Sequence, residues 1–168
     1  MRHKAAGSSL SIKIVTSLVL LLMVAFLIGS IFQRVLLIPG GLIFVISALC
    51  YMYAPVGYQI SNDKLIVLNR VGRKEFGPVV NCFAINEKIP CSLRLWGNGG
   101  LFAGTGIFWN RSYGIFRVYV TSSRKSDLVL VETAKQKILI SPENSANFIQ
   151  SYRALRWGNP GHERSLTY

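Results

Sequence analysis

The sequence predicts a membrane α-helical hairpin followed by a mainly β domain that ends in one helix. Two uncharged apolar segments, Ile14–Phe32 and Val35–Tyr53, stand almost back to back near the N-terminus. From Pro55 onward the pattern changes to short runs of alternating apolar and polar residues separated by turn signals, which is typical of β-strands. After Ser141, an amphipathic stretch predicts a single further helix.

Each apolar segment is about as long as the ~20 residues that a helix needs to cross the hydrocarbon core of a bilayer. Leu, Ile, Val and Phe surround the whole circumference, whereas a helix on the surface of a soluble protein keeps a polar stripe. Two buried core helices are the less favoured interpretation. A cleaved signal peptide would explain only the first segment, because a second span follows directly after Gln33 and Arg34.

Small residues shape the expected hairpin. Pro39-Gly40-Gly41 lies in the first third of the second segment and predicts either a kink or a late start of that helix. These glycines, with Gly29 and Ser30 near the end of the first segment, would let the two helices approach closely. Neither span contains Asp, Glu, Lys or His, so the hairpin is predicted to be an anchor and not an ion path.

The distribution of positive charge predicts the orientation of the hairpin. Residues 1–34 carry four basic and no acidic residues, and of these Arg34 alone lies in the connecting turn. The positive-inside rule then places both termini in the cytoplasm, with residues 1–13 as a basic N-terminal tail. The remaining chain carries 15 basic against 7 acidic residues, so we expect attraction to the anionic lipids of an inner (plasma) membrane.

Composition argues against several other classes of function. Nucleic acid is not an expected partner, because the basic residues are scattered singly and form no recognition motif. Cys50, Cys82 and Cys91 form no C-x-x-C pair and fit a reducing compartment; a Cys82–Cys91 disulfide would require an outward-facing domain. His3 and His162 lie near the two ends and form no metal-ligand cluster. We therefore predict no metal site, no cofactor and no catalytic residues.

Alternation and turn residues predict seven strands in the domain, at residues 58–61, 64–69, 73–76, 79–85, 115–121, 127–132 and 136–140. Asn62-Asp63 makes a tight turn between the first two strands. Val71-Gly72-Arg73 makes the next turn. Gly77-Pro78 is expected to interrupt the chain between the third and fourth strands, because proline cannot donate to a β-ladder.

The C-terminal helix has a recognisable start. Ser141 is a suitable N-cap, Pro142 suits the first helical position, and Glu143 favours the positive end of the helix dipole. Spacing at i, i+4 and i+7 gives one apolar stripe, formed by Phe148, Tyr152 and Leu155. Residues 158–168 are predicted to be a tail.

The most unusual composition lies between the predicted strands at residues 79–85 and 115–121, where Leu95–Asn110 is rich in glycine and aromatic residues. This stretch lacks the Gly-Lys-Ser/Thr ending of a phosphate-binding loop and the strand–G-x-G-x-x-G–helix unit of a dinucleotide site. We expect a bent, bulged crossing in which glycines allow close approach of the backbone. Its aromatic side chains would then pack inward or against lipid headgroups, namely Trp96, Phe102, Phe108 and Trp109.

The chain resembles the bacterial pleckstrin-homology (PH)-like domain proteins that carry two N-terminal transmembrane helices. The resemblance covers the two spans and the motifs Tyr58-x-Ile60-x-x-Asp63-x-Leu65, Arg94 and Trp96 through Gly100-x-Phe102-x-Gly104 to Phe108-Trp109-Asn110, Tyr119-x-Thr121, and Ile140-Ser141-Pro142 before Phe148. It implies a seven-stranded bent barrel closed by the C-terminal helix, within residues 55–157, after two transmembrane helices within 14–53. Ala146 departs from the family, in which a proline often precedes the helix. The family supplies no catalytic residues.

The resulting hypothesis is a membrane-anchored cytosolic interaction module that binds lipid headgroups or a protein partner. An enzyme is not expected. The alternative is a structural or regulatory subunit of a larger membrane complex, with the hairpin as its interface. The candidate contact residues are the tightest basic group and the aromatic residues of the glycine-rich stretch, namely Arg70, Arg73, Lys74, Trp96, Phe102 and Trp109.

Overall fold

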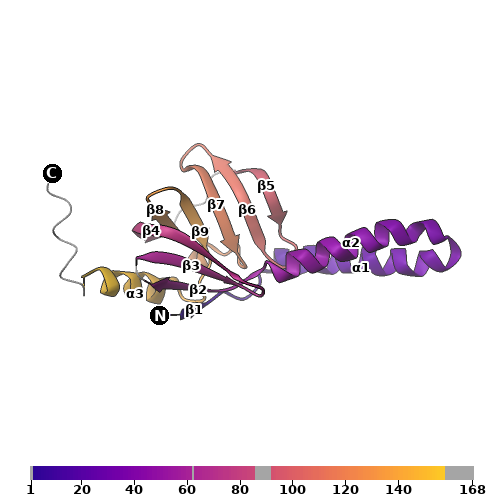
Figure 1. Cartoon of the computed structure of the whole chain (residues 1–168), viewed down its shortest axis with the longest axis horizontal. Helices are drawn as coiled ribbons and strands as arrows, with labels where there is room; N and C mark the ends of the chain where they lie inside the picture. Colours follow the sequence, from indigo (N-terminus) through magenta and orange to yellow (C-terminus); the bar gives the residue numbers. More distant parts are fainter. Residues whose placement is uncertain (1, 62, 86–91, 158–168) are drawn as a thin grey trace.

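The structure, a computed structural model, describes residues 2–61, 63–85 and 92–157. A hairpin of two helices, α1 (Leu10–Phe32) and α2 (Leu37–Met52), projects from a β-sheet domain that carries a third helix, α3 (Ser145–Trp157) (Figure 1). The sheet has nine strands, which are β1 (Arg2–Lys4), β2 (Pro55–Ser61), β3 (Lys64–Asn69), β4 (Arg73–Ala84), β5 (Leu93–Gly99), β6 (Gly104–Asn110), β7 (Gly114–Val120), β8 (Val129–Thr133) and β9 (Lys137–Ile140).

The helical hairpin has the expected length and turn. Two helical stretches, Leu10–Phe32 and Arg34–Met52, are long and apolar enough to cross a membrane, and the second consists of a short 3₁₀ turn at Arg34–Leu36 followed by α2. Because α2 begins at Leu37, Pro39 lies in its first turn, where proline is tolerated, so the late start is the correct alternative. A Cβ on Gly40 would lie 3.3 Å from Phe26 Cβ, which confirms that this glycine allows the helices to approach closely.

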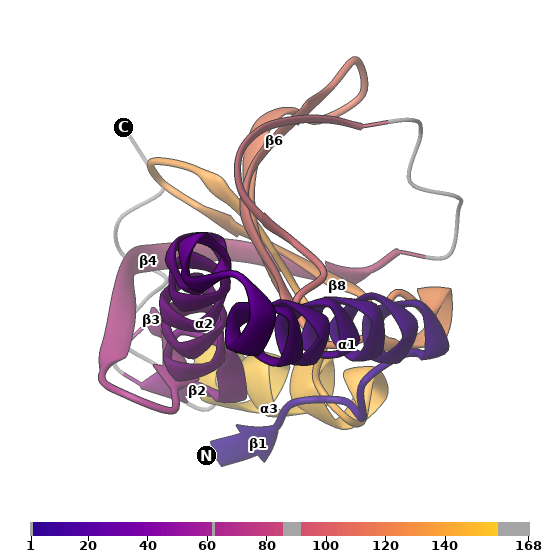
Figure 2. The same ribbon diagram turned by 90° about the vertical axis from the view of Figure 1, so that its right-hand side faces the viewer.

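The sheet is open and has nine strands, so the prediction of a seven-stranded barrel is wrong. Its strand order is β1-β2-β3-β4-β8-β9-β7-β6-β5, and all neighbouring pairs are antiparallel except β7 with β9. Figure 2, seen along the hairpin, shows the region around β6 standing away from the layer of β2, β3 and β4. We call β5, β6 and β7, residues 93–120, the arm.

Two differences within the domain explain part of the changed strand count. The glycine-rich stretch forms two regular strands, β5 and β6, with a register shift between Arg94 and Trp96 that matches the expected bulge. Conversely, the third and fourth predicted strands merge into β4. Gly77-Pro78 does not interrupt this strand but marks a change of partner, since residues 73–78 pair with β3 and residues 79–84 with β8.

The ninth strand comes from the segment before the first helix, which is therefore not the expected tail. In β1, His3 pairs with Tyr58 of β2. On the other side, the Glu143 amide donates to the Lys4 carbonyl at 2.9 Å, and the Ala6 amide donates to the Ser141 carbonyl at 2.8 Å. The segment thus bridges β2 and the chain that follows β9.

Apolar side chains fill both faces of the central strands. Alternation along β8 places Val129 and Val131 in one cluster, which includes Tyr58 and Phe148, while Leu128 and Leu130 belong to a second cluster on the opposite face. Burial raises the pKa of Tyr58 to about 12, and its hydroxyl donates to the Tyr119 carbonyl at 2.7 Å.

The N-cap of α3 is Asn144, whose Oδ1 accepts from the Asn147 amide at 2.9 Å, so the prediction of Ser141 was wrong. Ser141 is fully buried, and its hydroxyl instead accepts from the Thr121 amide at 2.8 Å. The apolar stripe of α3 is also shorter than predicted, because Leu155 at its end is 43% exposed.

Gly57→Val should detach β1 from the sheet. A Cβ at this buried position would lie 2.8 Å from the His3 carbonyl oxygen, so a larger side chain cannot coexist with the pairing of β1 and β2. Hydrogen exchange of the Ala6 amide should accelerate strongly. Gly77→Val is the matched control, since nothing lies within 4 Å of its Cβ position. Unchanged protection of Ala6 in Gly57→Val would contradict the integration of β1.

Candidate functional site

An open cavity of about 520 Å³ lies where the helical hairpin meets the sheet, and we call it the junction cavity. Six segments line it: residues 5–8, the first turns of α1, residues 54–56 at the start of β2, the turn between β3 and β4, the turn between β5 and β6, and the residue after β7. Its functional groups come from Lys13, Thr16, Ser17, Arg70, Phe102 and Thr121. None of the lining residues is acidic.

Hydrogen bonds between distant segments fix the walls of the junction cavity. The Phe102 amide donates to Thr16 Oγ1 at 3.0 Å, which ties the β5–β6 turn to α1. The Arg70 amide donates to the Ala54 carbonyl at 3.2 Å, and the Thr121 hydroxyl donates to the Ala6 carbonyl at 2.6 Å. The cavity is therefore bounded by backbone held on both the helical and the sheet side.

Arg70 is held over an aromatic ring at the end of α2. Its Cζ lies 4.1 Å from the centroid of the Tyr51 ring, which is a close cation–π contact. Phe102 meets the same ring edge-on, with centroids 5.3 Å apart and planes at 76°. Phe102 also has φ of +63°, an unusual conformation for a residue other than glycine. This backbone bend turns the chain between β5 and β6 against the helices.

In the structure, the three residues of the predicted basic group, Arg70, Arg73 and Lys74, point to different places. Lys74 lies over aromatic rings, with Nζ 5.3 Å from the Tyr119 centroid and 5.9 Å from the Tyr53 centroid. Arg73 points to the other side of β4, where its Nε lies 3.4 Å from a Glu75 carboxylate oxygen. Only Arg70 of the three lines the junction cavity.

Of the predicted aromatic contacts, the structure brings only Phe102 to the junction cavity. Trp96 and Trp109 lie on the arm and are 78% and 41% exposed. Sequence reasoning missed Lys13 and Tyr51 as site residues. The sequence does contain a signal for both residues. Lys13 lies just before the first apolar segment and Tyr51 near the end of the second, and basic residues and tyrosines at such positions are typical of the membrane–water boundary.

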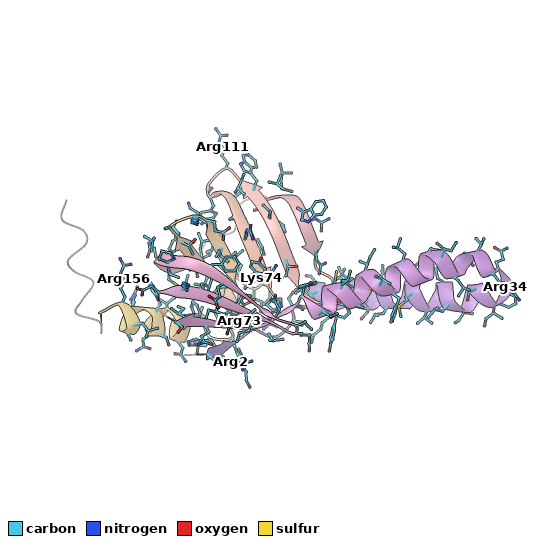
Figure 3. All side chains as sticks on the ribbon, viewed as in Figure 1. Arg2, Arg34, Arg73, Lys74, Arg111 and Arg156 are labelled. Carbon is cyan, nitrogen blue, oxygen red and sulfur yellow. The ribbon has the colours of Figure 1, made fainter. Side chains whose placement is uncertain are left out.

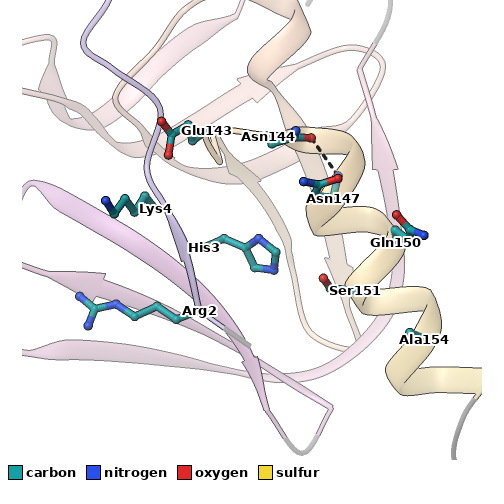
Figure 4. Close-up of a pocket in the computed structure, with 9 residues that line it drawn as sticks. All are labelled: Arg2, His3, Lys4, Glu143, Asn144, Asn147, Gln150, Ser151 and Ala154. Carbon is teal, nitrogen blue, oxygen red and sulfur yellow. Dashed lines mark hydrogen bonds between the residues drawn. The ribbon is translucent and has the colours of Figure 1, made fainter.

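A second cavity, of about 610 Å³, lies between β1 and α3 (Figure 4). The His3 ring points toward the helix, whereas Arg2 and Lys4 extend from the opposite side of the strand. The facing side chains of α3 are neutral and include Asn147 and Gln150. Burial lowers the pKa of His3, so the imidazole is neutral at pH 7. The charged residues of its lining are Arg2, Lys4 and Glu143, so the groove has basic and acidic groups together, whereas the junction cavity has basic groups alone.

Other chemistry is sparse in the part of the chain that the structure describes. No three His, Cys, Asp or Glu side chains there lie close enough to share a metal ion. Cys82 is a free thiol, and burial raises its pKa to about 12, so it is a poor nucleophile at neutral pH. Cys91, His162 and the predicted tail at 158–168 lie outside the described residues.

The fold and the cavity define a small β domain carried by an apolar helical hairpin, with a cationic cavity where the two meet. The bacterial PH domain family matches residues 56–155, and the chain belongs to this family. The match begins in β2 and ends in α3, so it confirms the resemblance noted from the sequence motifs and includes neither the hairpin nor β1. No curated protein and no solved structure matches the chain.

Proposed function

We propose that the chain is a membrane-anchored interaction module, without catalytic activity, whose junction cavity binds the headgroup of an anionic lipid. One observation carries this proposal. Lys13 and Arg70 line the same cavity, free of acidic residues, at the boundary between the apolar hairpin and the sheet domain. If the hairpin spans a bilayer, that boundary lies at the level of the lipid headgroups.

The lining suits a phospholipid in its chemistry. A phosphate diester is bound well by Lys and Arg together, and the hydroxyls of Thr16 and Ser17 can donate to phosphate or glycerol oxygens. Ile12 and Phe102 offer apolar surface for the first carbons of the acyl chains. The turn between β2 and β3 is less suitable for a phosphate group, because Nζ of its Lys64 lies 3.9 Å from a Glu75 carboxylate oxygen.

The proposed orientation has the domain and both termini in the cytoplasm, at the inner membrane. Figure 3 shows Arg34 at the far end of the hairpin, whereas Arg2, Arg73, Lys74, Arg111 and Arg156 lie on the domain at the other end. A single basic residue on one side against many on the other is the asymmetry that the positive-inside rule describes. The pairing of β1 with β2 supports placing the N-terminus on the same side as the domain.

Lipid-dependent thermal stability tests this function. Added phosphatidylglycerol should raise the Tm of the detergent-solubilised full chain by at least about 4 °C, the shift that about 1 kcal/mol of binding energy produces in a domain of this size. Phosphatidylcholine should not. Lys13→Gln and Arg70→Gln should each remove the shift, because each deletes a cation from the junction cavity.

Arg111→Gln is the matched control, since it removes the same charge at the exposed β6–β7 turn far from the hairpin (Figure 3). Arg73→Gln should also retain the shift, because its side chain already contacts Glu75. An equal response to both lipids would contradict the proposal. In that case, co-purification of another membrane protein in fixed ratio would favour the alternative, a subunit that assembles through the hairpin.

A further inference from the structure

The arm combines positive charge with exposed apolar side chains. Residues 93–120 contain three arginines and no acidic residue. The pairing register aligns Leu93, Trp109 and Ile115 in one row across its three strands, and all three are at least 41% exposed. Exposed apolar surface on a cationic background is complementary to an anionic lipid surface. The row itself lies at the end of the arm away from the β5–β6 turn, so the residues closer to that turn are the ones placed to meet lipid.

The outermost strand of the arm is the most exposed. β5 ends the strand order of the sheet, so one of its edges has no neighbouring strand among the described residues. The register shift after Arg94 adds a residue, and Leu95 and Trp96 are 55% and 78% exposed. Trp96 has the largest exposed fraction of the domain's large apolar side chains among the described residues.

The depth of β5 follows from its connection to the hairpin. The bond between the Phe102 amide and Thr16 fixes the β5–β6 turn one helical turn beyond Lys13. Trp96 precedes Gly99, the end of β5, by three residues, or about 10 Å along the strand. Because β5 runs obliquely to the hairpin axis in Figure 1, the height of Trp96 above the turn is smaller than this path length. Figure 1 shows β5 as the arm strand nearest to the hairpin. An indole at this position reaches the headgroup layer, which is roughly 5–8 Å thick on each side of the hydrocarbon core.

We infer that the β5 edge, through Arg94, Leu95 and Trp96, lies in the headgroup layer of an anionic membrane, whereas Trp109 on the next strand remains in water. Tryptophan is enriched at this depth because its ring is amphipathic, and the Arg94 guanidinium can bind lipid phosphate beside it. This inference rests on the proposed membrane anchoring of the hairpin. It does not depend on whether a lipid occupies the junction cavity.

Two single-tryptophan variants of the full chain test the inference. Trp109→Phe with Trp157→Phe leaves Trp96, and Trp96→Phe with Trp157→Phe leaves Trp109. Each is reconstituted in vesicles of phosphatidylcholine and phosphatidylglycerol that contain a phosphatidylcholine brominated near the carbonyl end of its acyl chains. The bromines should quench Trp96 several-fold more than Trp109, and aqueous acrylamide should show the opposite order.

Equal quenching of the two variants by the bromines, or no quenching of Trp96, would overturn the inference. Protection of both residues from acrylamide and bromine alike would show that protein covers the arm instead, from a partner or a second copy. Because each of these variants carries two substitutions, Trp96→Phe alone provides a second measurement: it should remove the bromine-quenchable part of the total emission while leaving the Tm unchanged. A normal phosphatidylglycerol response in the Tm assay with no quenching of Trp96 would separate failure of this inference from failure of the headgroup site.

Discussion

Phe148→Ala should lower the free energy of unfolding of the β domain by about 3–5 kcal/mol, the usual loss for a fully buried phenylalanine. The side chain is 0% exposed and lies in the cluster that joins α3 to the sheet. Its ring also meets His3 of β1 edge-on, with centroids 5.1 Å apart. The substitution therefore removes contacts to the helix, the sheet and the N-terminal strand together.

Leu155→Ala is the matched control for this prediction. It deletes an apolar side chain from the same helix, but Leu155 is 43% exposed and should cost less than about 1 kcal/mol. Urea unfolding of the full chain in mild detergent, followed by tryptophan emission, measures both variants, because all three tryptophans lie outside the hairpin. Equal losses for the two variants would mean that α3 does not close the core through Phe148.

Local patterns predicted the elements well where one physical signal dominated. Alternation located β3, β7 and β9 to within about two residues, and the length of the apolar segments located the hairpin. The start of α3 was misplaced because Ser141 and Asn144 are both good N-caps. The choice between them depends on the Thr121 amide, which binds the Ser141 hydroxyl from a distant strand. Such a competition cannot be read from local sequence.

The two largest errors concern strands whose local sequence gives no strand signal. A three-residue strand such as β1 has no detectable period, and its pairing with β2 crosses the whole hairpin in sequence. Likewise, glycine has low strand propensity, so β5 and β6 were expected to be an irregular crossing. Of the candidate contact residues, Phe102 and Arg70 meet at the junction cavity because the β3–β4 and β5–β6 turns both pack against the helices. The spacing of these residues in the sequence does not encode this tertiary arrangement.

Gly97→Ala should break the pairing of β5 with β6. Gly97 has φ of +115°, which an alanine adopts only with strain, and a Cβ there would lie 2.5 Å from the Cα of Gly106. Strain of this kind alone costs up to about 3 kcal/mol, and the backbone overlap adds to it. Because β6 is the one strand that pairs with β5 among the described residues, the damage should be local. Amide exchange in β5 should accelerate by about 100-fold or more while β8 stays protected.

The reciprocal variant Gly106→Ala should have the same effect, since its Cβ would lie 3.0 Å from the Cα of Gly97 on the facing strand. Gly77→Ala is the control, because this glycine lies in a strand with open space at its Cβ position. If the β5 edge lies in the headgroup layer, Gly97→Ala should also reduce bromine quenching of Trp96, which sits on the adjacent residue. Normal exchange and normal quenching in both variants would show that the close approach of Gly97 and Gly106 does not hold the arm together.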